Sequence, residues 1–154
     1  MNHDRIEVAD SMNQIDSIGT LVDLISKQMA VIGGNSDPVR IKSALENSLR
    51  PETRCRFFLW YSPEDELGAF VFSNICSGLE SGADYLWMNE LYVAKKYRRK
   101  YVASEILSYV EEWSVKQDIR HIACSTGLMN EPARGLFEKK AFELTDTIWV
   151  DKSL

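Results

Sequence analysis

The chain has 154 residues, 45% of them apolar and 27% charged, which is the balance of an ordinary globular protein rather than a disordered one. This length suits one domain with a substantial core, and we expect a single domain over residues 1–154. The formal net charge of -5 argues against a nucleic-acid partner, because a polyanion requires a broad basic surface.

The cysteines, the histidines and the hydropathy argue against membrane, secreted, disulfide-rich and metal-binding proteins. No apolar run reaches the roughly 20 residues that span a bilayer, and no secretory signal is seen, so we expect a cytoplasmic protein without a membrane partner. The three cysteines have no close spacing and the two histidines lie far apart. They suggest neither a disulfide framework nor a set of metal ligands, and we predict no metal.

The N-terminal third predicts a strand and a long helix. The strand covers residues 5–9, and Ser11 and Gln14 then have the spacing of a capping box at a helix start. Apolar residues recurring at steps of three and four mark the core face of the helix: Ile15, Ile18, Val22, Ile25 and Met29. We expect the pair Gly33-Gly34 to end this helix.

A second helix and a hairpin come next. Asp37 as N-cap and Pro38 in the first turn begin the helix, and Pro51 stops it. Runs rich in Phe, Trp and Val over residues 55–61 and 68–74 predict two antiparallel strands joined by a polar turn.

The C-terminal half alternates strands and helices. We expect a strand over 85–93, a helix over about 99–116, a strand over 121–125, a helix over 130–140 and a last strand over 142–150. The resulting order, β-α-α-β-β-β-α-β-α-β, predicts one mixed α/β domain.

The segment over residues 90–104 carries the chemistry. It is a strand end, a basic turn and the start of a helix, where free backbone N–H groups and the helix dipole favour a phosphate. Three cations surround this point: Arg98, Arg99 and Lys100. Small Ala103 and Ser104 let a ligand approach the backbone. Taken alone, the segment is equally compatible with a solvated basic turn.

Two motifs in this half resemble those of the GNAT superfamily of N-acetyltransferases. Val93, Tyr97, Arg98 and Ala103 match the acetyl-CoA signature, in which a strand ends in Val and Tyr-Arg-x-x-Gly-x-Gly/Ala opens a helix. Tyr101 occupies the place of the first glycine. If Tyr101 required a positive φ, the cost would be of order 1 kcal/mol; we expect it instead in ordinary helical space.

The second motif covers residues 130–142. It resembles the family's Asn-x-x-Ala-x-x-Leu-Tyr-Glu-Lys-x-Gly-Phe through Asn130, Ala133 and Leu136. Phe137 replaces the tyrosine that serves many relatives as a general acid, and Ala141 replaces the glycine. Phenylalanine has no proton to donate, so the acid would be another residue or water, or a thiolate would leave unassisted.

The resemblance implies a three-layer α/β (α+β) fold whose twisted mixed sheet of about six to seven strands splays after the fourth strand and is flanked by helices. It also implies acetyl-CoA as co-substrate. The residues that would bind it are Leu91, Tyr92, Val93, Arg98, Arg99, Lys100, Tyr101, Val102, Ala103, Ser104, Asn130, Ala133 and Phe137. Many relatives form dimers, so a homodimer is compatible with the resemblance.

Glu90 is the candidate catalytic base, since an ammonium group must lose a proton before its nitrogen can attack a thioester. The alternative is an ordinary strand glutamate that faces solvent or pairs with a lysine. Alternation along the strand places Glu90 and Tyr92 on one side with Met88, and Leu91 on the other.

The leading hypothesis is an N-acetyltransferase that moves an acetyl group from acetyl-CoA to a primary amine of a small molecule or peptide, by direct transfer in a ternary complex. The main rival is a catalytically impaired CoA-binding sensor or regulatory module. A protein that binds no CoA is the third reading, against which the matches at Arg98, Ala103 and Asn130 argue.

Overall fold

The computed structural model describes residues 4–154. They form two compact units, residues 4–124 and residues 125–154, and each unit is described by itself. The single domain expected over residues 1–154 stays a prediction.

The first unit is built on a five-stranded sheet in the order β1-β2-β3-β4-β5. Its strands and helices are β1 (Arg5–Ala9), α1 (Ile18–Ile32), α2 (Pro38–Ser48), β2 (Cys55–Tyr61), β3 (Leu67–Gly78), β4 (Ala83–Val93), α3 (Val102–Lys116) and β5 (Ile122–Cys124). Neighbours from β1 to β4 are antiparallel, whereas β5 runs parallel to β4. The mixed α/β class is confirmed, with fewer strands than the six to seven expected.

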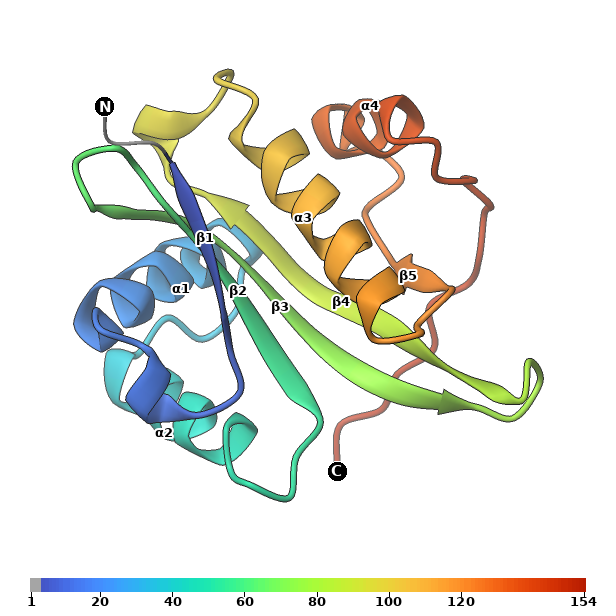
Figure 1. Cartoon of the computed structure of the whole chain (residues 1–154), viewed down its shortest axis with the longest axis horizontal. Coiled ribbons are helices and arrows are strands. Elements are labelled where there is room, and N and C mark those ends of the chain that lie inside the picture. The colour runs from blue at the N-terminus through green and yellow to red at the C-terminus, as the bar shows by residue number, and fades with distance from the viewer. Residues whose placement is uncertain (1–3) are drawn as a thin grey trace. The chain divides into compact units, whose positions relative to one another are not determined.

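Helices cover both faces of this sheet (Figure 1). Helices α1 and α2 pack on one face through an apolar cluster that includes Leu21, Ile41 and Phe70. On the opposite face, Trp113 of α3 meets the ring of Phe58 edge-on, with 5.2 Å between ring centres. Within residues 4–124 the sheet is therefore the middle of three layers.

The capping box at Ser11 and Gln14 is real but caps a different element. Gln14 Oε1 accepts from the backbone N–H of Ser11 at 3.2 Å, and the pair closes a short 3-10 turn over Met12–Gln14. The expectation that this box begins the long helix was wrong, since α1 starts only at Ile18. The two later signals hold: Asp37 Oδ1 accepts from Val39 N at 3.0 Å, and Gly33 ends α1 with a φ of 76°.

A bulge in β4 corrects the expected alternation of side chains. Phe72 of β3 pairs with Glu90, but the next residue, Ser73, pairs with Met88, so Asn89 is an extra residue in β4. Phe72 packs against the α1 and α2 cluster, and its neighbour Ser73 points to the other face. Met88 therefore lies on the α3 face and not with Glu90, because a bulge shifts the side-chain alternation by one residue.

The second unit contains α4 (Glu131–Lys139) and a well-formed C-terminal cap. Phe142 N–H donates to Phe137 O at 2.9 Å and Ala141 N–H donates to Glu138 O at 3.0 Å, which is the pattern of a Schellman motif. The strand expected over 142–150 was wrong: residues 142–154 form no helix or strand. Apolar alternation supplies the propensity for a strand, but a strand exists only when a neighbouring strand accepts its hydrogen bonds.

Candidate active site

Glu90 lies on the face of β4 that α1 covers. Its side chain is half-buried, and Gln28 of α1 donates from Nε2 to Glu90 Oε2 at 2.6 Å. Burial raises the pKa of Glu90, and the Gln28 hydrogen bond offsets part of that rise because it favours the ionised form. Glu90 is thus a carboxylate in a partly dry environment, held by a single neutral donor.

Gln28 is a site residue that the sequence analysis missed. It is only 7% exposed and stands among apolar residues on the core face of α1, four positions after Leu24 and seven after Leu21. A polar residue in the buried stripe of an amphipathic helix is the signal that could have revealed it, because such a residue needs a buried partner.

The end of β4 next to Glu90 has an open edge. β5 pairs only with Leu86, Trp87 and Met88, so residues 89–93 have no strand on that side among the described residues of the first unit. Pairing between the two strands stops at Met88, opposite Cys124, where β5 ends; this is the point at which the splay after the fourth strand was expected. The end of the pairing leaves an edge of backbone groups that an extended ligand can pair with.

Arg98 closes the turn after β4. Its Nε donates to the carbonyl oxygen of Val93 at 2.9 Å, and its guanidinium lies 5.4 Å from the centre of the Tyr92 ring. Arg98 is exposed, but in this geometry it holds the end of the strand as well as adding positive charge.

The backbone that leads into α3 forms a cradle of donors. Arg99 and Tyr101 both have positive φ, 59° and 65°, and the first helical bond of α3 runs from Glu105 N–H to Tyr101 O. In the described part of the chain, the amides of residues 99–104 have no hydrogen-bond acceptor. Successive free N–H groups around left-handed residues make a concave anion site.

Tyr101 corrects an expectation. It does not take ordinary helical φ but the left-handed conformation that the family's glycine favours, so α3 begins at Val102 rather than near Arg99. The Tyr101 side chain is 86% exposed, so it leaves the amides uncovered. The backbone geometry of the motif is kept, at a cost in strain.

Tyr97 anchors this cradle to the β2–β3 hairpin. Its hydroxyl donates to Glu66 Oε2 at 3.0 Å, and Lys96 Nζ bonds the same oxygen at 2.5 Å. The Tyr97 ring lies so close to Gly68 that a Cβ there would be 2.4 Å from the ring. Gly68 and Glu66 thus position the basic turn, and neither carries a sequence signal of its own.

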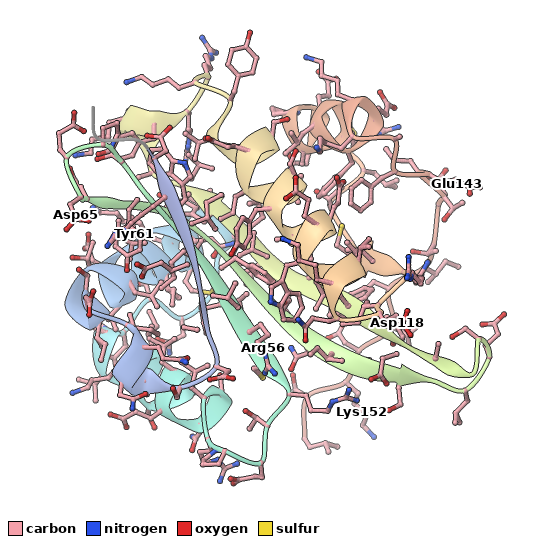
Figure 2. The ribbon with its side chains drawn as sticks, in the orientation of Figure 1. Arg56, Tyr61, Asp65, Asp118, Glu143 and Lys152 are labelled. Atoms are coloured by element: carbon pink, nitrogen blue, oxygen red, sulfur yellow. The ribbon has the colours of Figure 1, made fainter. Side chains whose placement is uncertain are left out.

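The same end of the hairpin is tied to β1. Figure 2 shows Tyr61 and Asp65 near one another at this end of the sheet. Arg5 of β1 donates to Asp65 Oδ1 at 2.7 Å, and its guanidinium lies 3.8 Å from the centre of the Tyr61 ring. These contacts brace the hairpin turn that carries Glu66.

The remaining candidates lie together on α4 in the second unit. Asn130 is the N-cap, and its Oδ1 accepts from Ala133 N at 3.3 Å. Phe137 is buried, its ring 5.2 Å from that of Phe142, which is the apolar contact usual for a Schellman motif. Ala141 has a φ of 60°, so the second motif also keeps a left-handed residue where relatives have glycine.

Comparison with protein families decides what this arrangement belongs to. The family model of the acetyltransferase (GNAT) family matches residues 27–142, which include β4, the donor cradle and α4. The chain belongs to the GNAT family. A search of curated proteins finds no match.

Solved structures agree in fold. A probable acetyltransferase shares 24% sequence identity at a TM-score of 0.82, with 97% of this chain and 96% of that chain covered. A possible acetyltransferase from Clostridium difficile 630 shares 17% identity, a TM-score of 0.82, and coverage of 99% and 98%. An aminoglycoside N-acetyltransferase in complex with CoA shares 16% identity, a TM-score of 0.78, and coverage of 98% and 95%.

Membership in the GNAT family identifies the chain as an acetyltransferase-type protein and accounts for both sequence motifs. The open edge of β4, the donor cradle and Glu90 all lie in the first unit, within 16 residues of sequence over 89–104. None of the helices over residues 4–154 is long and apolar enough to cross a membrane.

Proposed function

We propose that this GNAT chain transfers an acetyl group from acetyl-CoA to a primary amine, by direct attack of the amine within a ternary complex. The observation that carries the proposal is Glu90, a half-buried carboxylate with a raised pKa beside the open end of β4. An acyltransferase that uses an amine needs such a base, because the ammonium form has no lone pair.

The donor cradle supports acetyl-CoA as the co-substrate. Free amides over residues 99–104 suit a pyrophosphate, and Arg99 and Lys100 are exposed next to them. The unpaired edge of β4 suits an extended pantetheine chain with amide groups. When bound, acetyl-CoA supplies an activated thioester, and the protein's task is to orient it and to ready the amine.

Direct transfer is favoured over a cysteine-bound intermediate. Burial raises the pKa of Cys124, which disfavours the thiolate form that a nucleophilic cysteine requires. In the route we propose, Glu90 accepts the ammonium proton and the neutral nitrogen attacks the thioester carbonyl. The C–S bond then breaks, and the second N–H proton, lost as the amide forms, goes to the departing thiolate or to water.

The acceptor we propose is a small-molecule or peptide amine. Neighbouring solved structures include aminoglycoside N-acetyltransferases and a ribosomal-protein-alanine N-acetyltransferase from Brucella melitensis biovar Abortus 2308. These neighbours support both acceptor classes, and the acidic net charge favours a cationic acceptor in either case.

A second candidate is a CoA-binding regulatory module. Phe137 favours it, because the family's tyrosine acid is missing at this position. The two candidates share the cofactor site and differ only in whether an amine is acetylated.

The test is a screen of primary amines with acetyl-CoA, in which release of the CoA thiol is followed and the product is identified by its mass. The enzyme reading predicts turnover that is lost in Glu90→Gln and kept in Glu46→Gln, a matched change at an exposed residue of α2. Calorimetric binding of acetyl-CoA without turnover of any amine would favour the regulatory module. Absence of both binding and turnover would refute both.

A further inference from the structure

The amide of Gln28 is only half used. Its Nε2 donates to Glu90, but its Oε1 is buried and has no hydrogen-bond donor among the described residues. A buried acceptor without a donor is unfavourable, so a state in which Gln28 Oε1 gains a donor relieves that cost.

The chemistry of the pair identifies that state. An ionised carboxylate only accepts hydrogen bonds, so with Glu90 ionised the NH₂ end of Gln28 must face it and the Gln28 oxygen is left without a partner. A protonated carboxyl group has one O–H donor. The amide that already bonds Glu90 carries an unpaired acceptor, Gln28 Oε1, which such an O–H could use.

We propose that Gln28 is a positioning residue that holds Glu90 through proton transfer, bonding the carboxylate with Nε2 and receiving the new O–H of Glu90 at Oε1. This proposal deepens the proposed function and rests on it for its role in catalysis. When an ammonium group gives a proton to Glu90, one N–H bond breaks, its electron pair stays on nitrogen, and one O–H bond forms on Glu90.

The surroundings leave Gln28 as the main polar partner of Glu90. Across the sheet Glu90 pairs with Phe72 of β3, and Tyr92 is the next residue on its face of β4. No charged side chain from α1, β3 or β4 in the described chain contributes to the pKa shift of Glu90. Without Gln28, neither protonation state of Glu90 would have a fixed partner.

The first test is a pH titration of the glutamine side-chain NMR signals in the chain alone, without acetyl-CoA or amine. It therefore tests the proposal whether or not the protein is an enzyme. The chain has three glutamines, Gln14, Gln28 and Gln117, so glutamine side-chain amide signals are few, and Gln28→Met assigns one of them. As Glu90 is protonated, the Gln28 Cδ signal should move downfield because its oxygen gains a hydrogen bond. Its Nε2 protons should move upfield, because their partner loses charge.

Gln117 should show no such titration, and Glu90→Gln should abolish the response of Gln28. Movement of the Nε2 protons without movement of Cδ would overturn the proposal, since Oε1 would then stay unpaired in both states. Persistence of both movements in Glu90→Gln would also overturn it.

The second test is the pH dependence of kcat/KM for the amine. Loss of Gln28 removes a charge-assisted hydrogen bond from ionised Glu90 and a weaker neutral one from the protonated form. Gln28→Met should therefore shift the acid limb of the kcat/KM profile to higher pH, by about one pH unit or less. Lys27→Met, the adjacent exposed position on α1, should leave the limb in place. An active Gln28→Met enzyme with an unmoved limb would refute the positioning role and leave the proposed function standing.

Discussion

Replacing Tyr101 by glycine should stabilise this protein. The residue has a φ of 65°, which costs a residue with a Cβ about 1–2 kcal/mol relative to glycine. Glycine gives back about 0.5–1 kcal/mol through the greater freedom of the unfolded chain. Since the Tyr101 side chain is 86% exposed, little packing is lost. The two ranges differ by about 0–1.5 kcal/mol, and the middle of that range gives an expected gain for Tyr101→Gly of about 0.5–1 kcal/mol in the free energy of unfolding.

The matched control is Tyr101→Ala, which removes the same ring and keeps the Cβ that causes the strain. Urea denaturation followed by circular dichroism should show a higher midpoint for Tyr101→Gly only, with the melting temperature raised by about 2 °C. An equal gain in Tyr101→Ala would show that the ring, and not the backbone, was unfavourable. A loss of stability in Tyr101→Gly would refute the assignment of strain to this residue.

The structure makes three further predictions, for Gly68, Ala141 and Glu90. Gly68→Ala should weaken acetyl-CoA binding in calorimetry and destabilise the chain by about 1–3 kcal/mol, because the new Cβ would lie 2.4 Å from the Tyr97 ring. Ala141→Gly should raise the free energy of unfolding by about 0.5–1 kcal/mol in denaturant titrations, since Ala141 has a φ of 60°. Because burial raises the pKa of Glu90, the folded state binds that proton more tightly than the unfolded state, and the associated stability is present at acid pH and lost as pH rises through the folded pKa. Denaturant titrations at acidic and neutral pH should therefore show a smaller fall in stability for Glu90→Gln than for the unchanged chain.

Most of the fold could be predicted because its elements are marked locally. Asp37 before Pro38 signals a helix start by an interaction within three residues, and the structure has that capping bond. β2 was predicted with its observed bounds, Cys55–Tyr61, because its run of aromatic residues is too dense for any other element.

The errors arise where a local sequence signal does not by itself decide the structure. Ser11 and Gln14 satisfy the capping-box spacing, yet the box closes a single turn because that spacing does not fix the length of the helix it begins. The apolar residues over 142–150 favour a strand, but pairing with another strand decides whether one forms.

The candidate site also has residues that the sequence predicts and residues that it does not. Glu90 was found from its place in a motif, whereas the separation of Met88 from its face depends on the bulge at Asn89, which is a matter of register between two strands. Tyr101 hid the left-handed position because the usual signal, glycine, is absent. Gln28 escaped notice because its partner is 62 residues away in the sequence.

The most direct test of the central claim is a comparison of kcat/KM for the best primary amine between the unchanged chain, Glu90→Gln and Glu46→Gln, with acetyl-CoA saturating. A general base contributes about 10²- to 10⁴-fold, so Glu90→Gln should lose at least a hundredfold while Glu46→Gln stays unchanged. Glu90→Gln with activity equal to that of Glu46→Gln would contradict the assignment of Glu90 as the base.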